Sequence, residues 1–299
     1  MNSPIKILFG TLFLAVALVA GNAVTSGDNT DHDAQQDNGT VTTQVDNGNS
    51  SRGHNDKGGT AASTKGDAKL LVTKILRGAN ISEKEIISLK RAGYIAAYNP
   101  AVKIPVWVAW NLTDTNCDGP YKRDGQKFNA DMDVPAPRAE HLDYVNSGYD
   151  RGHMCPSADC RWSEEAQQQS FLLTNICPQL HNLNAGDWKE LEERCRTWAE
   201  EYGSIYIVCG PILLNKRHKT IGKNKITVPE AFFKVVLRTG KKPAAIGFIY
   251  RNERANKTMS SYVNSVDEVE RITGLDFFSS LPDNIENKVE AKADLSDWK

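Results

Sequence analysis

The chain has 299 residues, with 36 Lys and Arg against 37 Asp and Glu and a formal net charge of −1. This length suits one large domain or two small ones. The charge is uneven, because residues 21–67 hold seven Asp and three Lys or Arg, and residues 68–299 therefore carry a net charge of +2. A net charge this small excludes a protein that coats nucleic acid stoichiometrically, because such proteins are strongly basic.

The N-terminus has the layout of an export signal. Residues 7–20 are uncharged and mostly apolar, Lys6 precedes them, and small residues follow. The run is shorter than the roughly 20 residues that a membrane helix needs. We predict a signal peptide over residues 1–23 and export to the periplasm or the extracellular space, with no stable membrane span after its removal. The alternative is an uncleaved segment that tethers the chain to a membrane.

Residues 24–67 have a different composition from the rest of the chain. They are rich in Asp, Asn, Gly, Thr, Ser and Gln and have almost no large apolar side chains. Such a segment cannot bury enough apolar surface to offset the entropy lost on ordering. We predict a disordered low-complexity tether over residues 24–67 and a single folded domain over residues 68–299.

The first part of the predicted domain reads as a helix followed by strands. Residues 68–91 place apolar side chains together and contain a Ser82-x-x-Glu85 pattern typical of a helix N-terminus. Residues 94–98 and 104–112 are rich in β-branched and aromatic residues and predict strands. A long polar loop should follow over residues 113–148.

The second part mixes helices and strands without a βαβ rhythm. Apolar residues recur every three or four positions over residues 184–202, which predicts a helix ended by Gly203. A short helix is predicted over residues 266–273, and a weakly ordered segment after it. The predicted strands cover residues 171–173, 204–209, 231–237 and 244–250. The fold class is therefore α+β, with a central, mostly antiparallel sheet.

An even number of cysteines follows the export signal, which favours disulfides. Six cysteines allow 15 pairings, and the sequence alone does not choose among them. There is no CxxC pair, so a structural zinc site is not expected. Buried free thiols are the alternative. The six are Cys117, Cys155, Cys160, Cys177, Cys195 and Cys209.

The most informative stretch is Asp150-Arg151-Gly152-His153. A guanidinium can grip a phosphate through two donors, and a neutral imidazole can accept a proton from water near pH 7. The stretch therefore suits chemistry on a phosphate. A lone histidine is more often an ordinary core or surface residue, and Asp150 could simply fix the loop or pair with Arg151.

Three residues elsewhere could complete such a site. Asn184 could offer an amide oxygen to Mg²⁺, which keeps most of its waters, although an Asn184-x-x-Asp187 pattern also suits a helix cap. Glu192 lies about two helical turns further on and could orient a water or the histidine. It could equally be a solvated helix charge, and Arg123 could be a plain surface arginine in a polar loop.

Together the motifs resemble one family. The ordered set is similar to the DNA/RNA non-specific endonuclease family, the relatives of mitochondrial endonuclease G, over roughly residues 90–280. The residues that carry the resemblance are Asp150-Arg151-Gly152-His153, Asn175-Ile176, Pro178-Gln179, Asn184, Trp188 and Leu191-Glu192.

The resemblance implies a fold, roles and a cofactor. The fold is a ββα-metal site on a central antiparallel sheet. His153 matches the general base and Asn184 the Mg²⁺ ligand, with Mn²⁺ as a substitute. Glu192 matches the family's glutamate next to the metal, Arg151 its motif arginine and Arg123 its upstream arginine, both of which would hold the phosphate.

The resemblance also implies partners. The substrates would be DNA and RNA, cut with little sequence specificity, and a homodimer and an inhibitor protein are further partners suggested by relatives. Cys155 and Cys177 lie beside the two motifs and could form a local disulfide.

Alternative functions stay open from the sequence. One is an exported nucleic-acid-binding or uptake module without cleavage. Others are a hydrolase of small phosphate esters and an exported nuclease toxin.

Overall fold

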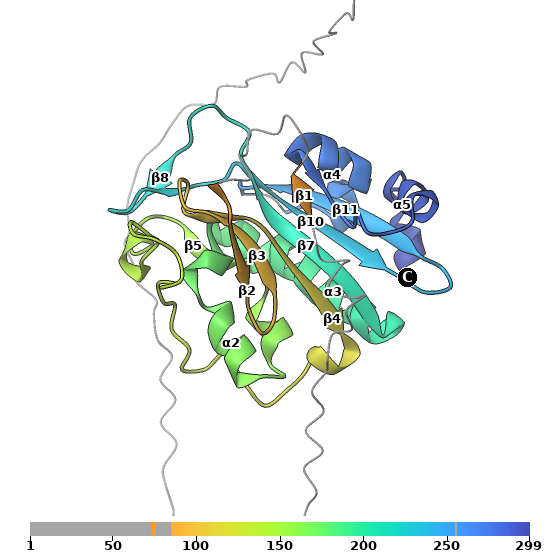
Figure 1. Cartoon of the computed structure of the whole chain (residues 1–299), viewed down its shortest axis with the longest axis horizontal. Helices are drawn as coiled ribbons and strands as arrows, with labels where there is room; N and C mark the ends of the chain where they lie inside the picture. Colours follow the sequence, from red (N-terminus) through yellow and green to blue (C-terminus); the bar gives the residue numbers. More distant parts are fainter. Residues whose placement is uncertain (1–72, 76–84, 255) are drawn as a thin grey trace, which may run out of the picture. The chain divides into compact units, whose positions relative to one another are not determined.

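The computed structural model describes residues 73–75, 85–254 and 256–299. The predicted signal peptide and tether lie outside these residues, as does the predicted start of the domain. A seven-stranded antiparallel sheet forms the centre of the described part, in the order β12-β11-β10-β7-β4-β3-β2 (Figure 1). Its strands are β2 (Ile87–Lys90), β3 (Ile95–Asn99), β4 (Ile104–Thr113), β7 (Ser204–Ile212), β10 (Ala231–Arg238), β11 (Ala244–Arg251) and β12 (Val263–Asn264).

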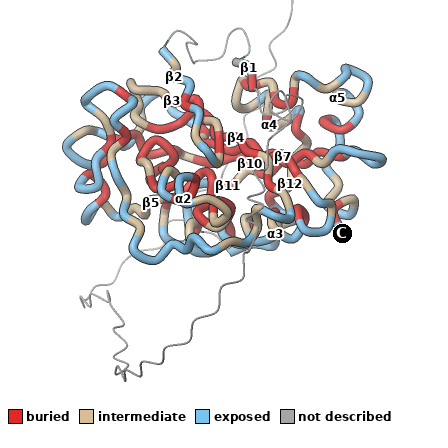
Figure 2. The backbone as a smooth tube through the Cα atoms, turned by 60° about the horizontal axis from the view of Figure 1, so that its bottom comes forward, coloured by how far each residue is buried: buried red, intermediate tan, exposed pale blue. Residues whose placement is uncertain are grey.

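The central strands are apolar because both faces of the sheet are covered. β4, β7 and β10 run through the buried interior (Figure 2). Alternate residues of β10 enter two separate apolar clusters, so that Phe232 and Val236 join one and Phe233 and Val235 join the other. This alternation follows from the two-residue period of a strand. The predicted α+β class with an antiparallel sheet is confirmed, as are the predicted strands at 94–98, 104–112, 204–209, 231–237 and 244–250.

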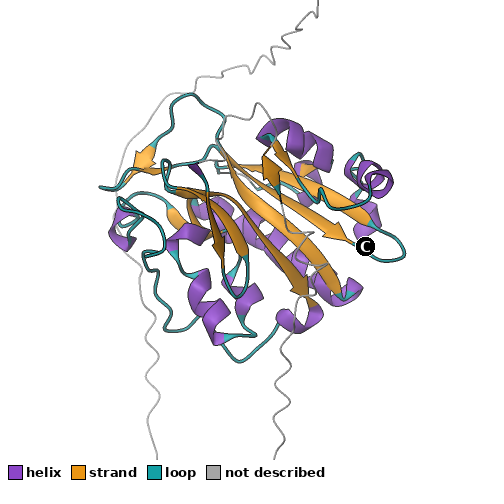
Figure 3. Ribbon diagram, viewed as in Figure 1, coloured by secondary structure: helices purple, strands orange, loops and turns teal. Residues whose placement is uncertain are grey.

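Helices form a layer on each face (Figure 3). The cluster on one face includes residues of α2 (Glu164–Ser170) and α3 (Trp188–Tyr202), and the cluster on the other includes residues of α4 (Val266–Thr273) and α5 (Asp283–Glu290). Gly203 follows α3 in the left-handed conformation at φ 80°, which ends the helix as predicted. Among the described residues, no helix has the length and apolar character that would let it cross a membrane.

Two short strands stand apart from the large sheet. β5 (Asp150–His153) and β6 (Ile176–Gln179) pair with each other in an antiparallel two-stranded sheet. α3 follows β6 in the chain, after a π-helical turn over Leu183–Asp187. This succession of two strands and a helix is the predicted ββα arrangement. The pair is tied to the large sheet by the Cys209 thiol, which donates to the Met154 carbonyl at 3.2 Å.

Two predictions near the ends of the chain fail where the structure describes them. Within the helix predicted over 68–91, two segments are strands: β1 (Lys74–Ile75) pairs with β13 (Leu275–Asp276), and β2 pairs with β3, while residues 76–84 lie outside the described residues. Pairing with neighbouring strands outweighs local helical spacing in these two segments. The C-terminal segment is ordered by burial, since α5 packs on the sheet and Trp298 is 1% exposed against Trp198.

The predicted strand at 171–173 is also wrong. Phe171 lies in a turn, and a 3₁₀ turn covers Leu173–Asn175. The segment keeps one isolated bridge, between Leu172 and Asn129. Phe171 and Leu173 are buried and Leu172 is half-buried, so the short apolar run indicated burial but not the backbone conformation.

The six thiols, all within the described residues, are free in the structure. Five are buried in the cluster on the α3 side of the sheet. Cys155 Sγ lies 3.7 Å from Cys160 Sγ, with no disulfide between them. Cys155 and Cys177 are both free, so the predicted disulfide between them is not present. The alternative of buried free thiols describes this structure.

Three carboxyl groups meet between α4 and α5. One carboxylate oxygen each of Asp267, Glu270 and Glu290 lies within 4.8 Å of the others. Glu290 is buried, and its Oε1 has no hydrogen-bond partner among the described residues. Burial, with the nearby charges of Glu270 and Glu286, raises the pKa of Glu290 to about 9. Glu290 is therefore protonated in the folded protein at neutral pH.

This protonation predicts a pH-dependent gain from Glu290→Gln. The folded protein binds a proton that the unfolded chain releases above the ordinary glutamate pKa of about 4.3, so stability falls as the pH rises from there towards 9. A glutamine does not titrate, so the Glu290→Gln variant does not lose this stability as the pH rises. We expect the thermal midpoint of Glu290→Gln to exceed the parent's by at least about 2 °C at a pH of about 8 and by little at a pH of about 4.

The matched control is Glu201→Gln on the exposed end of α3. It should change the midpoint equally at both pH values. A Glu290→Gln variant less stable than the parent at the higher pH would contradict the assignment.

Candidate active site

β5 presents the Asp-Arg-Gly-His stretch in a fixed register against β6. Asp150 pairs with Gln179 and His153 pairs with Ile176. A Cβ atom on Gly152 would collide with the side chain of Gln179, so only glycine lets the two strands approach this closely. The glycine of the motif is therefore a packing requirement, and the residues on either side of it carry the chemistry.

His153 lies in an aromatic cage that sequence reasoning missed. Its ring centroid is 5.3 Å from that of Phe128 and 5.1 Å from that of Phe171. The residue is 8% exposed, and Nε2 has no hydrogen-bond partner among the described residues. Burial and then the charge of Arg123 lower the pKa of His153 to about 3. The imidazole is therefore neutral in the free protein.

Both predicted phosphate-binding arginines stack on the same aromatic rings. Arg123 Cζ lies 5.5 Å from the Phe171 ring centroid, and Arg151 Cζ lies 5.2 Å from that of Phe128. Arg151 is also 6.0 Å from the Tyr144 ring. Neither arginine has an acidic partner among the described residues. Ring stacking thus positions two guanidinium groups beside His153 and leaves their charge available to an anion.

Asn184 joins this strand through a carboxylate. Its Nδ2 donates to Asp150 Oδ2 at 2.9 Å, and His181 Nδ1 lies 2.9 Å from the same oxygen. The helix-cap interpretation of Asn184 is wrong, because its side chain bonds to Asp150 and makes no cap. Asp150 does fix the local structure, but by holding Asn184 and His181, with no ion pair to Arg151.

A backbone irregularity sets the position of Asn184. It lies in the π-helical turn over Leu183–Asp187, where Gly186 has the non-helical angles φ −109° and ψ −113°. π-type turns inside helices are frequent at functional sites. The predicted helix therefore becomes regular only at Trp188, four residues later than expected.

Glu192 projects from α3 into a buried cluster of charges. Burial raises the pKa of Glu192 to about 7, against the opposing charge of Lys234. Asp159 lies in the same cluster and accepts hydrogen bonds from Arg196 at 3.0 Å and from Trp110 at 3.1 Å. Glu192 is half-buried, and its pKa responds to Lys234, Asp159 and Arg196, so it is not an ordinary solvated helix charge.

Lys234 is the centre of that cluster and was also missed. It is fully buried, its Nζ has no hydrogen-bond partner among the described residues, and Nζ lies 4.5 Å from the Trp188 ring and 5.5 Å from the Trp110 ring. One signal was available: it is the only charge inside the apolar strand Ala231–Leu237. A buried lysine needs nearby groups that offset the loss of hydration of its charge, and here the two tryptophan rings lie beside it.

The residues around Asn184 fit a hydrated divalent cation. Its Nδ2 is engaged by Asp150, and this orientation turns the amide oxygen Oδ1 away from that bond as a neutral ligand. The half-exposed Asp150 carboxylate supplies negative charge alongside. One amide oxygen with a nearby carboxylate matches the preference of Mg²⁺ for oxygen ligands and retained waters. The carboxyl group at Glu290 lies with α4 and α5 and shares no residue with this site.

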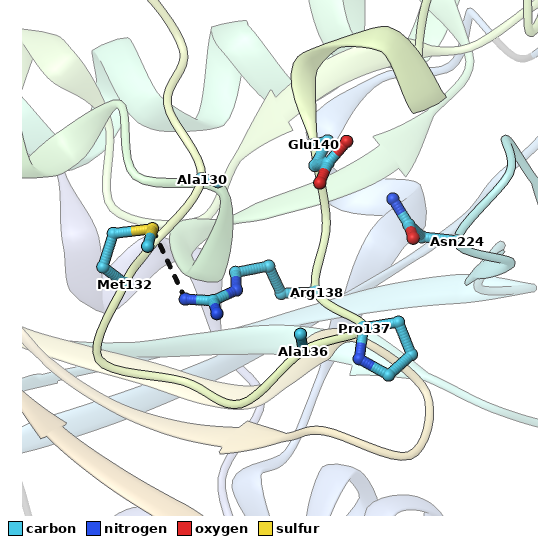
Figure 4. A pocket seen from close by; sticks show the side chains of 7 residues that line it. All are labelled: Ala130, Met132, Ala136, Pro137, Arg138, Glu140 and Asn224. Carbon is cyan, nitrogen blue, oxygen red and sulfur yellow. Dashed lines mark hydrogen bonds between the residues drawn. The ribbon is translucent and has the colours of Figure 1, made fainter.

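A separate hollow lies next to the polar loop. It has a volume of about 470 Å³ and contains none of the predicted site residues (Figure 4). Arg138 reaches across it to Met132, and Asn224 faces it from another part of the chain. Its lining residues are Ala130, Met132, Ala136, Pro137, Arg138, Glu140 and Asn224. The hollow is thus separate from the His153 site.

The fold and site define a class: a ββα nuclease-like centre on an antiparallel sheet. The model of the DNA/RNA non-specific endonuclease family matches residues 76–284. This chain belongs to that family.

Individual relatives agree with this assignment. The chain is 33% identical to the Xenopus laevis mitochondrial nuclease EXOG over 62% of its length, and spans 56% of that protein. It is 30% identical to Bos taurus endonuclease G, covering 64% of this chain and 69% of that one, and 33% identical to a Nostoc nuclease, covering 67% and 76%. A chain of the crystal structure of the EndoG/EndoGI complex superimposes with a TM-score of 0.63 at 26% identity, covering 66% of this chain and 88% of that one.

The surroundings of His153 predict its titration. We expect NMR to place its pKa well below the ordinary value of about 6.5. Arg123→Gln should raise that pKa, because it removes a charge that opposes protonation. A bound phosphate anion should raise it as well. Since the folded-state pKa is depressed, the stability held by neutral His153 is lost as the pH falls from about 6.5.

The control is Arg138→Gln, an arginine that does not act on the pKa of His153. It should leave the titration unchanged. A His153 pKa near 6.5 in both variants and the parent would contradict the buried, neutral assignment.

Proposed function

We propose that the protein is an exported, metal-dependent endonuclease that hydrolyses phosphodiester bonds of DNA and RNA with little sequence specificity. The observation that carries the proposal is a buried, neutral His153 whose two neighbouring rings, Phe128 and Phe171, each carry an arginine without an acidic partner among the described residues. The strand of His153 is joined through Asp150 to Asn184. The family of the chain supports the same activity.

The roles of the protein groups follow from their positions. Arg123 and Arg151 hold the scissile phosphate, and their charge offsets the negative charge that develops in the transition state. His153, neutral in the free protein, accepts a proton from the attacking water on its imidazole ring. Water so activated attacks phosphorus in line with the leaving oxygen.

Substrate binding strengthens the base. A histidine with a pKa of about 3 is a weak base in the free protein. A phosphate anion placed between the arginines opposes the charge of Arg123 and favours the protonated imidazole. The pKa of His153 therefore rises when substrate is present, towards the range in which general-base catalysis is effective.

Asn184 would hold the divalent cation through Oδ1, with Asp150 fixing the amide and Glu192 about two helical turns further along the chain, in α3. When bound, Mg²⁺ supplies positive charge to the phosphate and the leaving oxygen, and Mn²⁺ could replace it. Glu192, poised near neutral pH, orients a water molecule or the histidine.

The substrate range follows from the kind of contact. Groups that bind phosphate carry no direct information on base sequence. DNA and RNA should therefore both be cut. A nucleic-acid-binding or uptake module without cleavage would have no use for a neutral, caged histidine, and this observation favours the enzyme over that alternative.

Export and partners are also part of the proposal. The apolar run at 7–20 supports export by a signal peptide, with periplasmic or extracellular activity and an uncleaved tether as the alternative. The similarity to a chain of the EndoG/EndoGI complex, whose description concerns EndoG inhibition, supports an inhibitor protein as a partner. Such a partner would suit a nuclease toxin, and a homodimer stays a prediction.

The decisive experiment incubates the purified protein with supercoiled DNA and with RNA, with and without Mg²⁺. We expect both substrates to be cut, and His153→Ala to lose about 10²–10⁴-fold in rate while retaining DNA binding. The matched control is His54→Ala in the predicted tether, which should keep the parent's rate. Near-normal cleavage by His153→Ala would refute the role of the histidine, and hydrolysis of a small phosphodiester alone would favour the small-ester hydrolase.

Removal of the metal tests the role of Asn184. EDTA should abolish cleavage, and Asn184→Ala should raise the Mg²⁺ concentration for half-maximal activity at least about tenfold. Asn182→Ala is the control, since Asn182 is exposed, lies in the same turn and makes no side-chain cap. Activity that is indifferent to EDTA would exclude the metal.

A further inference from the structure

One short segment of the chain concentrates positive charge. Residues 215–225, here called the basic arm, contain five Lys and Arg and no Asp or Glu. The rest of residues 68–299 consequently carries a net charge of −3. All five cations are exposed, and none takes part in an ion pair within the part of the chain that the structure describes. They are Lys216, Arg217, Lys219, Lys223 and Lys225.

The basic arm has a defined structure. Its β8 strand (Thr220–Ile221) forms a hairpin with β9 (Ile226–Thr227), which directly follows the arm, and Ile221 and Ile226 are both buried. Asn224 donates to the Asp143 carboxylate twice, from its backbone nitrogen and from Nδ2, each at 2.9 Å. These contacts fix the arm on the polar loop that runs into β5. The cations are thus displayed on a rigid support, which lowers the entropy lost when they bind a ligand.

The segment that carries the basic arm joins the large sheet close to the β5–β6 pair. This segment leaves the large sheet after Ile212 and returns to it at Ala231, and these two residues pair with each other. Asn252 Nδ2 donates to the carbonyl of Pro229 at 2.9 Å and to that of Pro178, in β6, at 3.1 Å. β8 and β5 accordingly lie at the same end of the sheet (Figure 1).

One cation of the arm reaches the residue before the motif. Lys219 Nζ lies 4.8 Å from the ring centroid of Tyr149, which directly precedes Asp150. The arm therefore approaches β5 through Lys219, and its other four exposed cations lie within six residues of Lys219 in the chain. A negatively charged ligand that extends from His153 past Tyr149 would meet exposed cations of the arm.

We propose that the basic arm binds the phosphates of a polynucleotide beyond the scissile bond. This proposal rests on the proposed function and extends it, because it makes a long nucleic acid, in preference to a short oligonucleotide, the natural substrate. A single phosphate is accommodated by Arg123 and Arg151, and five further unpaired cations have no role with so small a ligand. Double-stranded DNA carries one charge per about 1.7 Å of axis, which suits a row of separate lysines.

Salt dependence of binding tests the proposal independently of cleavage. Binding of a duplex is measured by fluorescence anisotropy in EDTA from about 50 to about 200 mM salt. Each phosphate contact contributes a slope of about 0.9 in log K against log salt. If Lys216, Arg217 and Lys223 are changed together to Gln, the slope should fall by about 2.7, so that the parent loses about 40-fold more affinity over this range than the variant.

A matched variant controls for the loss of three charges. Lys241, Lys242 and Lys288 are exposed, unpaired among the described residues and distant from the arm. The first two lie in the turn between β10 and β11, at the opposite end of the sheet from Ile212. Their joint change to Gln should lower the slope by less than about 0.9.

Kinetics complete the test. With Mg²⁺, the arm variant should raise KM for long DNA, keep kcat, and hydrolyse bis(p-nitrophenyl) phosphate like the parent. If the arm variant loses its fold, as its thermal midpoint will show, Lys216→Gln with Lys223→Gln replaces it, with an expected slope change of about 1.8.

The outcomes separate the two proposals. Equal salt slopes for the arm and control variants overturn the role of the arm, whatever the cleavage results, and would assign the cations to an acidic protein or an anionic membrane surface. A parent that binds DNA through the arm but cuts no substrate overturns the proposed function and leaves the role of the arm intact.

Discussion

The site depends on the burial of one imidazole among aromatic rings. Phe128 and Phe171 remove His153 from water, and the same rings hold Arg151 and Arg123 on their outer faces. One pair of aromatic rings therefore does two things: it keeps the base neutral by desolvation, and it carries two cations close to the base, of which Arg123 lowers the pKa of His153 further. An anion is the one kind of ligand that this combination favours, because it satisfies the arginines and relieves their effect on the histidine.

The scaffold supplies this cage by joining segments that are far apart in the chain. The large sheet is rigid and buried on both faces, and the two-stranded β5–β6 sheet is attached to it by side-chain bonds from Cys209 and Asn252. The buried Lys234, held between Trp110 and Trp188, connects the sheet to the first turn of α3. A desolvated cation in that position stabilises the carboxylates around it, Glu192 and Asp159, and so links the packing of the core to the electrostatics of the site.

Much of the fold could be predicted from the sequence, because the central strands are long, apolar and fixed by their own composition. The short elements at the edges could not be predicted. Ile87–Lys90 becomes a strand only because β3 lies alongside it, and the C-terminal residues are ordered only because Trp298 packs against Trp198. The motif identified the candidate residues, but the sequence did not reveal which residues surround them in the fold. Phe128 and Phe171 lie in a polar loop and a turn, and nothing local marks them as neighbours of His153. The hydrogen bond from Asn184 to Asp150 depends on a π-helical turn that periodicity does not reveal.

The uneven distribution of charge has a practical consequence. With a formal net charge of −1, the protein would be expected to pass through a cation exchanger at neutral pH. The exposed cations of residues 215–225 form a local anchor that a bulk charge does not describe. We therefore expect retention on a sulfonated column in one preferred orientation, with the arm towards the matrix, and elution by soluble polyanions such as heparin.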